Sequence, residues 1–404
     1  MSPSQASGEK KPRLLIVSDC FLPRWDGVAR FLSKVIPGLA DDFEVTAIAP
    51  AFPGGEPEFP GKEKARLIRI PTLGMRILDY NMARPTPGTY LAIRRAVAEA
   101  DIVFVQTIGP VLGWMAILAA WSRRKPVVTY VHAIEHELLA KYLSLRSVFA
   151  IFSNWLVRLA SRAIYNRTSL IMVPSEEVGE LLTWNGVRTR KAVVHLGIDL
   201  AAFSPPLSKA SAKKAIGLRP DTPTIGFLPR LTSEKDPLTL LRAFARLRKF
   251  YPNLMLIAIG NGEDGILRKF ADQRGVWLLG IQNDVVPYLQ AMDINVLPSL
   301  TETTSLSTLE AMACGCAVVA TPVGYVKEYI VHGKNGYFFT QKDVFGLMRR
   351  LKQLLEDKEM RLALAKEARR TVEERFDWER TLEKIRTLLL SELGKQHSND
   401  KEAE

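Results

Sequence analysis

The chain has 404 residues, of which 47% are hydrophobic and 24% charged, and its formal net charge is +12. This composition is that of a soluble globular protein with an ample core, and the length suffices for two or three domains. The positive charge favours anionic partners, such as nucleotides, nucleic acid or acidic lipid, or else indicates a basic solubilising surface.

The three cysteines, Cys20, Cys314 and Cys316, exclude a disulfide scaffold and fit a reducing compartment. We interpret Cys314 and Cys316 as small buried residues, because no second Cys/His cluster accompanies them to complete a metal site. Residues 1–13 contain no apolar signal core and predict a short disordered lead. The longest strongly apolar stretch, residues 111–121, is shorter than the stretch of about 20 residues that spans a bilayer. We therefore expect no transmembrane segment.

Short apolar runs alternate with helical stretches along the whole chain. Continuous apolar runs of this kind indicate strands that are covered on both faces. The expected strands are residues 14–18, 45–50, 102–106, 127–132, 170–175, 192–197, 224–229, 254–260, 276–280, 294–299 and 317–321. The expected helices include residues 30–41, 86–100, 236–251 and 305–315. The repeated strand–helix order predicts parallel sheets with right-handed crossovers.

The composition changes once, at residues 199–223, which are rich in Pro, Ser, Ala and Lys. We interpret this stretch as the linker between two α/β domains, each with a Rossmann-like parallel sheet, that face a cleft. The predicted domains are residues 1–198 and 199–375, and residues 376–404 are predicted to form an amphipathic helix with a polar tail.

Ligands of such sheets bind at the carboxyl ends of the strands, so the residues that follow each strand are the candidates for a site. Asp26 and Gly27 form a turn before a helix whose first amides can bind an anion, or they form an ordinary strand–helix turn. His132 ends a strand and is either structural or catalytic. Arg230 and Lys235 follow another strand and either clamp a diphosphate or pair with neighbouring acids.

Residues 260–265, GNGEDG, match the G-x-G-x-x-G pattern of dinucleotide sites, with Asp284 about 20 residues further on. Two features disfavour an NAD site. Glu263 and Asp264 would repel a pyrophosphate, and the motif lies late in the second domain instead of in the opening strand–helix–strand unit.

The stretch SLTETTSLSTLEAMACG, residues 299–315, carries two glutamates after a predicted strand. If a helix begins near Ser305, Glu302 lies in the loop and Glu310 lies inside the helix. Thr304 or Ser305 can then cap the helix, and its exposed amides favour a phosphate. Glu302 is placed to accept sugar hydroxyls and Glu310 to bind a vicinal diol, unless Glu310 is an ordinary charge of the first turn.

Together these stretches resemble the family 4 glycosyltransferases, which have the GT-B fold. The main signature is the pair Glu302…Glu310 followed by AMACGCAVVAT. It is joined in family order by HLGIDLAAFSP, FLPRLTSEKDPLTLLRAF, IAIGNGEDGILRKFA and LLGIQNDVVPYLQAMDINVLPSL. The resemblance covers nearly the whole chain and implies an acceptor-binding first domain, a nucleotide-sugar-binding second domain and a C-terminal helix that returns to the first domain.

The resemblance also implies roles for the candidate residues. The implied catalytic residues are His132, Arg230, Lys235 and Glu302. The implied donor-binding residues are Gly27, Arg230, Lys235, Gly260, Ile281, Glu302, Thr304, Ser305, Leu306 and Glu310. The implied acceptor-side residues are Asp26, Gly27 and His132. Two departures concern the donor and the linker: Thr303-Thr304-Ser305 stands where the family has Gly-Phe-Gly, and His195 replaces the usual Asn.

The family transfers a hexose with retention of the anomeric configuration and without a metal. The resemblance therefore implies a UDP- or GDP-linked sugar as co-substrate, no further cofactor and no metal site. We expect the paired cations to stabilise the leaving diphosphate, an electrostatic contribution that often dominates catalysis.

Residues 21–39 and 130–175 resemble the lipid-directed members: phosphatidylinositol mannosyltransferases, diacylglycerol glycosyltransferases and sulfolipid synthases. Independently of the family, residues 138–175 contain no Asp or Glu. A basic, aromatic, amphipathic segment of this kind either lies in a lipid interface or is a core helix with its basic face in water. The predicted membrane-contact residues are Lys141, Arg146, Trp155, Arg158 and Arg162. We expect a cytoplasmic protein that is peripheral on the inner face of the membrane, with an anionic lipid surface and a lipid acceptor as partners and no nucleic acid.

Three alternatives remain open. The acceptor is a soluble sugar or polysaccharide; the protein is an NAD-dependent oxidoreductase that uses residues 260–265; or it binds a sugar nucleotide without catalysis.

Overall fold

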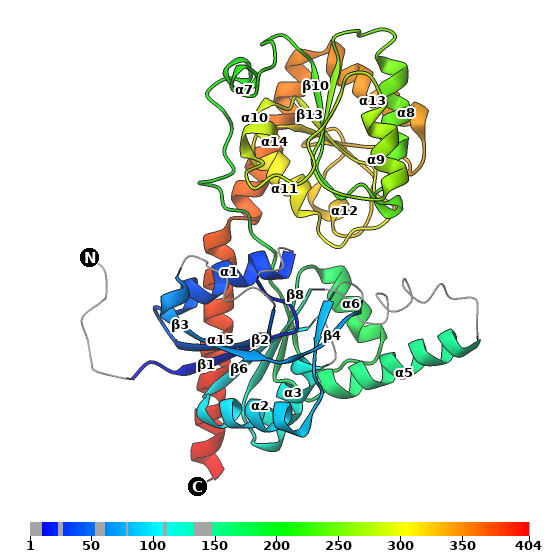
Figure 1. The fold of residues 1–404 in the computed structure, drawn as a ribbon. Coiled ribbons are helices and arrows are strands. Elements are labelled where there is room, and N and C mark those ends of the chain that lie inside the picture. The colour runs from blue at the N-terminus through cyan, green and yellow to red at the C-terminus, as the bar shows by residue number, and fades with distance from the viewer. Residues whose placement is uncertain are drawn as a thin grey trace, which may run out of the picture. The chain divides into compact units, whose positions relative to one another are not determined.

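The computed structural model describes residues 10–22, 27–52, 61–77, 80–107, 111–132 and 148–403. The chain divides into two compact units, and Figure 1 labels the elements of each. Unit 1 comprises Met1–Val194 with Leu382–Glu404, and unit 2 comprises His195–Thr381. The roles that the sequence analysis gives to the two domains stay predictions at this point.

Unit 1 contains a parallel sheet in the order β3-β2-β1-β6-β7-β8-β9, as the alternating pattern predicts. Its strands are β1 (Arg13–Ser18), β2 (Glu44–Pro50), β3 (Ala65–Ile70), β6 (Ile102–Thr107), β7 (Val127–Val131), β8 (Leu170–Val173) and β9 (Lys191–Val193). The antiparallel strands β4 (Thr72–Ile77) and β5 (Tyr80–Ala83) form a small second sheet. Residues of the central strands are almost completely buried, which explains why their sequences are continuously apolar.

The helices of unit 1 are α1 (Gly27–Leu39), η1 (Lys62–Lys64), α2 (Pro87–Glu99), α3 (Leu112–Ser122), α5 (Val148–Tyr165) and α6 (Glu176–Trp184). Two of them begin at capping side chains: the Thr86 hydroxyl accepts from Thr89 N at 3.2 Å, and the Ser175 hydroxyl accepts from Val178 N at 3.3 Å. Such caps satisfy backbone donors that the first turn of a helix leaves open.

Unit 2 contains a second parallel sheet in the order β12-β11-β10-β13-β14-β15. Its strands are β10 (Thr224–Phe227), β11 (Met255–Ala258), β12 (Val276–Leu278), β13 (Ile294–Leu297), β14 (Ala317–Ala320) and β15 (Tyr337–Phe338). Its helices are α7 (Lys209–Ala215), η2 (Ser233–Lys235), α8 (Pro237–Leu247), α9 (Asp264–Ala271), α10 (Val286–Ala291), α11 (Leu306–Ala313), α12 (Val326–Tyr329), α13 (Val344–Glu356) and α14 (Lys358–Arg375).

The helices of unit 2 cover both faces of this sheet (Figure 1). Buried residues of α8, α9 and α13 pack in one cluster with Ile225, Phe227 and Val296. Residues of α11 and α14 pack with Leu297 and Val318, and those of α10 pack with Ile257. The fold is therefore α/β with a parallel sheet in each unit, and the fold class predicted from the sequence is confirmed.

The predicted linker at residues 199–223 contains the helix α7, which the sequence analysis missed. Lys213 of α7 is buried, and its Nζ lies 2.7 Å from Asp293 Oδ2. The same carboxylate oxygen accepts from Thr224 N at 2.9 Å at the start of β10. This ion pair fastens the helix to the sheet of unit 2.

The last helix, α15 (Trp378–Ala403), packs on unit 1 from Leu382 onward. Leu382 lies against Gly38 of α1, and Arg386 Nε lies 2.6 Å from Asp42 Oδ2. Further along, Glu392 Oε1 pairs with Arg190 at 2.5 Å. The C-terminal helix thus returns to the first unit.

Candidate functional site

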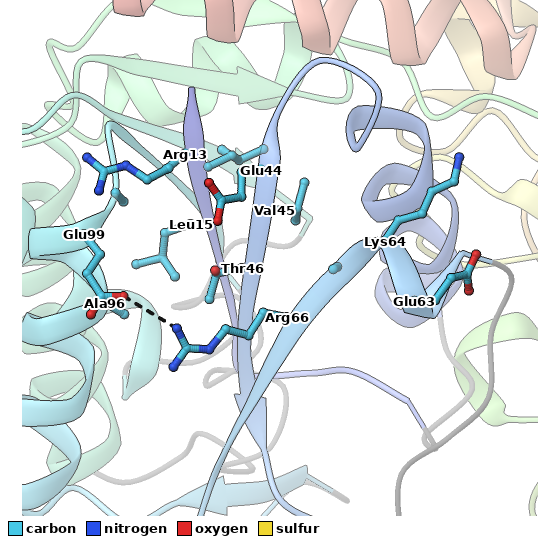
Figure 2. A pocket seen from close by; sticks show the side chains of 13 residues that line it. Arg13, Leu15, Glu44, Val45, Thr46, Glu63, Lys64, Arg66, Ala96 and Glu99 are labelled. Carbon is cyan, nitrogen blue, oxygen red and sulfur yellow. Dashed lines mark ion pairs between the residues drawn. The ribbon is translucent and has the colours of Figure 1, made fainter. Parts of the chain in front are cut away.

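A hollow of about 370 Å³ lies at the amino ends of the strands of unit 1 and contains none of the predicted site residues. Figure 2 shows its lining, to which β1, β2, η1, β3 and α2 contribute charged side chains of both signs. Its three cations are paired: Arg13 lies 2.8 Å from Asp101, Lys64 lies 3.4 Å from Asp41, and Arg66 lies 3.7 Å from Glu99. Lys235, Glu302 and His132 lie instead after the carboxyl ends of strands, where parallel sheets bind ligands.

The structure brings Lys235 and Glu302 together. Lys235 follows β10 and Glu302 follows β13, and these two strands are neighbours in the sheet of unit 2. Lys235 Nζ lies 2.9 Å from Glu302 Oε1, and only 16% and 9% of the two side chains are exposed. A buried cation is thus held beside the loop that the sequence analysis singled out.

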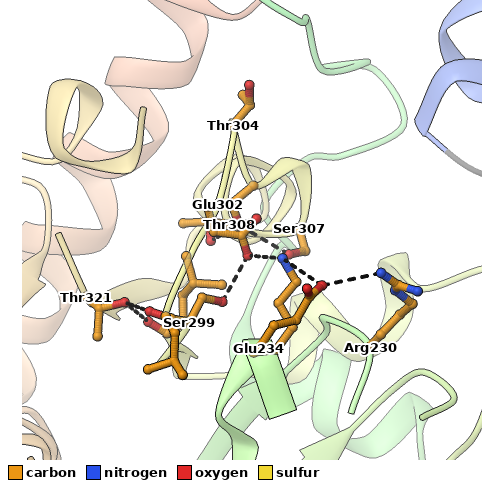
Figure 3. A network of polar contacts seen from close by, with 12 residues as sticks. Arg230, Glu234, Ser299, Glu302, Thr304, Ser307, Thr308 and Thr321 are labelled. Carbon is orange, nitrogen blue, oxygen red and sulfur yellow. Dashed lines mark hydrogen bonds and ion pairs between the residues drawn. The ribbon is translucent and has the colours of Figure 1, made fainter. Parts of the chain in front are cut away.

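Arg230 belongs to the same polar network through Glu234, as Figure 3 shows. Arg230 NH2 lies 3.4 Å from Glu234 Oε1, and Lys235 Nζ lies 4.0 Å from the same oxygen. The Arg230 side chain is 69% exposed, so its guanidinium remains accessible to an anion. The sequence left two alternatives for Arg230 and Lys235: they clamp a diphosphate or they pair with neighbouring acids. The two are compatible, because the ion pairs with Glu234 and Glu302 hold these cations at the strand ends.

Glu302 is positioned by groups that the sequence analysis did not predict. The Ser299 hydroxyl donates to Glu302 Oε1 at 2.9 Å, and Ser299 is completely buried. The Thr321 hydroxyl at the end of β14 donates in turn to the Ser299 carbonyl at 2.6 Å. In the sequence, Ser299 stands out because it lies at the end of an apolar run. Its position does not reveal that its hydroxyl donates to Glu302.

The helix α11 begins at Leu306, and Glu310 lies inside it with only 4% of its surface exposed, as predicted. The prediction that Thr304 or Ser305 caps this helix is wrong for the side chains. In the described part of the chain, the Ser305 hydroxyl accepts from no backbone N–H of α11, and it contacts the Thr308 hydroxyl at 2.8 Å. The reason is the backbone: Ser305 has a φ of 59°, in the left-handed region, whereas a capping side chain needs an extended backbone at this position.

That left-handed conformation favours glycine, and Ser305 stands where the family pattern has its second glycine. The loop is held from outside: Tyr325 N donates to the Thr303 carbonyl at 2.9 Å, and the Tyr329 hydroxyl donates to the Thr304 carbonyl at 3.0 Å. Among the described residues, the buried Thr304 hydroxyl has no hydrogen-bond partner. The backbone of the loop is therefore held by the segment that follows β14.

Gly324 permits the close approach that holds this loop. A Cβ at this position would lie 1.9 Å from the Glu302 carbonyl oxygen, and the residue has a φ of 49°. Only glycine meets both requirements without strain.

The GNGEDG loop packs beside the predicted phosphate clamp. A Cβ at Gly262 would lie 2.1 Å from the Leu231 carbonyl oxygen, so glycine is needed for the two segments to pair. Glu263 accepts from both the N–H and the hydroxyl of Ser233 at 2.7 Å, and these hydrogen bonds lower the pKa of its carboxyl. The loop thus supports the segment that carries Lys235, a role that needs no dinucleotide.

Gly260 and Ile281 lie at the ends of β11 and β12, on the same edge of the sheet as Lys235. Gly260 N donates to the Gly280 carbonyl at 2.7 Å, and Ile281 is 75% exposed. Gly260, Ile281 and Lys235 therefore all lie at the carboxyl ends of the strands of unit 2.

In unit 1, Gly27 is the first residue of α1, and a Cβ there would meet nothing within 4 Å. Asp26 lies outside the described residues. His132 follows β7, and its Nε2 lies 2.8 Å from Gln106 Oε1 at the end of β6. Burial against the rings of Phe31 and Tyr130 lowers the pKa of His132 to about 3, so its imidazole is neutral at neutral pH.

The sequence analysis also missed Asp19, which directly follows β1. Its carboxylate accepts from Leu112 N at 3.0 Å and from Gly113 N at 3.1 Å, at the start of α3. Burial raises the pKa of Asp19 to about 6, although these two backbone donors act in the opposite direction. The partners are more than 90 positions apart in sequence, so no local pattern indicates them.

Part of the predicted membrane segment is described. Lys141 and Arg146 lie outside the described residues, whereas Trp155, Arg158 and Arg162 are exposed on α5. Leu156 and Leu159 are exposed as well, at 50% and 46%. Among the described residues, no helix is both long and apolar enough to cross a bilayer.

Cys20, Cys314 and Cys316 are buried free thiols, and burial raises the pKa of Cys314 and Cys316. The interpretation of Cys314 and Cys316 as small buried residues is confirmed.

Comparison with known families identifies the class of protein. The description "Glycosyltransferase Family 4" matches residues 25–202, and "Glycosyl transferases group 1" matches residues 208–371. The chain therefore belongs to the GT-B glycosyltransferases, and its predicted family resemblance is confirmed.

Named relatives give this class more detail. A Corynebacterium urealyticum protein named D-inositol 3-phosphate glycosyltransferase is 30% identical over 56% of this chain and 58% of its own length. A Mycolicibacterium smegmatis protein named GDP-mannose-dependent alpha-(1-6)-phosphatidylinositol monomannoside mannosyltransferase is 26% identical over 90% of this chain and 95% of its own length. The first match thus spans little more than half of that relative.

Among solved structures, the Anabaena protein HepE in complex with UDP superposes with a TM-score of 0.73 and 19% identity. The match covers 94% of this chain and 100% of that one. At this identity the likeness shows a shared fold.

Proposed function

We propose that this protein transfers a hexose from a UDP- or GDP-linked sugar to the headgroup of a membrane lipid, with retention of the anomeric configuration. Family membership supports glycosyl transfer as the reaction class. The observation that carries the proposal is the 2.9 Å ion pair between Lys235 and Glu302 at the carboxyl edge of the sheet of unit 2.

Lys235 and Arg230 hold the donor diphosphate in this proposal. Negative charge accumulates on the diphosphate as its bond to the sugar breaks, and fixed cations stabilise that charge as it develops. Glu234 and Glu302 keep the two cations in place before the donor binds. Because the cations neutralise the leaving group, we expect the reaction to need neither a metal nor a further cofactor.

Glu302 binds hydroxyls of the transferred sugar, together with the backbone of Thr304, Ser305 and Leu306 at the start of α11. Glu310 binds the ribose, and the segments at Gly260 and Ile281 bind the base. Glu302 is suited to this role because Ser299 and Lys235 fix its carboxylate in one position. A carboxylate held in this way recognises hydroxyl geometry with little loss of conformational entropy.

In unit 1, Gly27 and His132 contribute to the acceptor side. His132 is neutral because burial lowers its pKa to about 3, so it acts as a hydrogen-bonding group and not as an acid. No covalent nucleophile is invoked: the acceptor attacks from the face that the diphosphate leaves, and a phosphate oxygen of the leaving group takes the proton.

A lipid acceptor is supported by the exposed apolar and basic side chains of α5 and by the name of the mycolicibacterial relative, a phosphatidylinositol monomannoside mannosyltransferase. Trp155 and Leu159 are placed to enter a lipid interface, with Arg158 and Arg162 beside anionic headgroups. The protein would then act as a peripheral enzyme on the inner face of the membrane.

A soluble acceptor is the second candidate. The corynebacterial relative, 30% identical, bears the name of a D-inositol 3-phosphate glycosyltransferase. The chemistry at Lys235 and Glu302 is the same in both cases, and only the acceptor differs.

One series of assays tests these proposals. Thermal unfolding with UDP-, GDP- and ADP-sugars identifies the donor, and the stabilising sugar is then offered with vesicles of phosphatidylinositol or diacylglycerol and, separately, with inositol phosphate. We expect stabilisation by one nucleotide sugar and transfer to lipid with the donor's anomeric configuration. Transfer to inositol phosphate alone supports the second candidate, and an inverted product overturns retention. No stabilisation by any nucleotide sugar overturns the glycosyltransferase proposal for this chain.

A further inference from the structure

A second exposed apolar surface lies on unit 2, between α8 and α13, which run side by side on one face of the sheet (Figure 1). We call it the α8–α13 face, made of Arg242, Arg246, Lys249 and Phe250 on one side and Phe345, Arg349, Lys352 and Glu356 on the other. Arg242 and Arg246 lie on α8, Lys249 and Phe250 lie in the turn that follows it, and the second set recurs at helical spacing along α13. The reaction proposed above uses neither set.

Two aromatic side chains project from this face. Phe250 is 73% exposed and Phe345 is 68% exposed. Between them lies a groove of about 630 Å³, with Leu247, Tyr251 and Met348 in its lining. Clustered exposed apolar side chains on a soluble domain mark a surface that another body covers.

The charges around the groove are mostly positive. Arg242, Arg246, Lys249, Arg349 and Lys352 are all exposed. The Arg246 guanidinium lies 5.5 Å from the centre of the Phe345 ring, which joins the two sets. Glu356 is the acid of the face, and it accepts from the Tyr251 hydroxyl at 2.7 Å and lies 3.8 Å from Lys352. The face is therefore complementary to an anionic partner.

We propose that the α8–α13 face docks on an anionic lipid bilayer. Phe250 and Phe345 enter the interface between headgroups and acyl chains, and the surrounding cations contact lipid phosphates. A bilayer suits this face because exposed phenyl rings and exposed long cationic side chains occur together on it, the combination that binds the interface of an anionic membrane. This inference rests on the proposed function in one respect: an enzyme with a lipid acceptor must bind at a bilayer. The α8–α13 face belongs to unit 2, whereas α5 belongs to unit 1.

A fluorescent label tests insertion directly. The protein's own cysteines are buried, so Phe345→Cys can be labelled selectively with an environment-sensitive fluorophore. We expect a blue shift and a rise in emission on adding vesicles of equimolar phosphatidylcholine and phosphatidylglycerol, weakened by salt, and little change with phosphatidylcholine alone. The matched control is Arg370→Cys on α14, whose buried Ala368 and Val372 pack with α11. An unchanged spectrum at position 345, or an equal change at both positions, overturns the proposal.

Sedimentation with the same vesicles separates this face from α5. In a Trp155→Ser/Leu159→Ser background, adding Phe250→Ser and Phe345→Ser should weaken vesicle binding roughly tenfold. All four side chains are exposed, so thermal unfolding should change little. Undiminished binding in the quadruple variant, or capture of an acidic protein without vesicle binding, contradicts the inference. Stabilisation by a nucleotide sugar tells the two proposals apart: it persists if only the docking surface is wrong, and it is absent if the proposed function is wrong.

Discussion

The side chain of Lys235 is charged but only 16% exposed, although the residue lies at the carboxyl ends of the strands of unit 2. Glu302 satisfies it at 2.9 Å, and Ser299 and Glu234 surround the pair. In the proposed reaction, a cation held in this way is already oriented when the donor diphosphate binds, so little reorganisation is needed.

Replacing Lys235 tests that role at the residue scale. We expect Lys235→Ala to lower kcat by about 10²–10³, because the developing charge on the diphosphate loses one preorganised cation. Steady-state kinetics with the stabilising nucleotide sugar measures the loss. The matched control is Lys269→Ala on α9, which should retain the wild-type rate. A wild-type rate for Lys235→Ala would refute the assignment.

His132 gives the protein a dependence on pH whose sign follows from its depressed pKa. The unfolded chain takes up a proton near pH 6.5 and the folded chain only near pH 3, so His132 makes folding less favourable as the pH falls through this window. Asp19 has the opposite effect. Because its pKa is raised from 3.8 to about 6, it makes folding more favourable as the pH falls from about 6 to 3.8.

A His132→Asn variant isolates this contribution. We expect wild type to lose more stability than the variant between pH 7 and pH 5, since Asp19 is common to both proteins. Urea unfolding at the two pH values measures the difference. Equal losses would show that the imidazole is not held neutral by its surroundings.

At this scale, the sequence identified residues that directly follow apolar runs, such as Lys235, Glu302 and His132. It did not identify Ser299, Gln106 or Asp19 as partners. The hydrogen bonds of Gln106 and Asp19 join segments 26 and 93 positions apart, respectively. Hydrophobic periodicity carries no information about such pairings.

At the scale of elements, the loop after β13 takes its shape from the segment after β14. Gly324 lies against the Glu302 carbonyl, and Tyr325 and Tyr329 donate to the next two carbonyls of the loop. The position of Glu302 therefore depends on residues that touch no substrate in the proposed reaction.

Gly324→Ala tests that dependence. The new Cβ would meet the Glu302 carbonyl at 1.9 Å in a left-handed conformation that alone costs about 1–2 kcal/mol. We expect lower stability, measured by chemical unfolding, and a raised KM for the donor. Gly217→Ala is the matched control, because Gly217 has a φ of 82° and open space around its Cβ. Equal stability and equal KM in the two variants would show that the close approach of Gly324 to the Glu302 carbonyl does not fix the loop.

The sequence predicted the central strands of both sheets because burial on two faces leaves a continuous apolar run. It missed β3 and β15, which lie at sheet edges and have mixed or very short sequences. It also missed α7, because residues 199–223 were interpreted as a linker from their composition. The burial of Lys213 against Asp293 is a tertiary interaction, which composition does not reveal.

At the scale of the whole molecule, α15 contributes to the core of unit 1 although it follows unit 2 in sequence. Leu382, Ile385, Leu389 and Leu393 are buried, and Arg386 pairs with Asp42. Each fully buried aliphatic side chain contributes about 1.5–3 kcal/mol, and the net stability of a domain is only about 5–15 kcal/mol.

A chain ending at Thr381 should therefore lose much of the stability of unit 1 while unit 2 keeps its fold. Hydrogen exchange measures this region by region, with faster exchange expected in β1 and α1 and unchanged exchange in β10 and β13. A chain ending at Gln396, which keeps the buried leucines, is the control. Equal protection of unit 1 in both truncated chains would contradict a structural role for α15.

The way in which the loop after Glu302 is held has a consequence for how this protein diversifies. The groups that fix its backbone stand in another segment, on Gly324, Tyr325 and Tyr329, and they contact carbonyl groups that every amino acid possesses. Thr303 is exposed, so its side chain can be exchanged while these contacts keep the backbone in place. In the proposed reaction the loop binds the transferred sugar, so sugar preference and fold stability would be separable traits in a combinatorial library at this position.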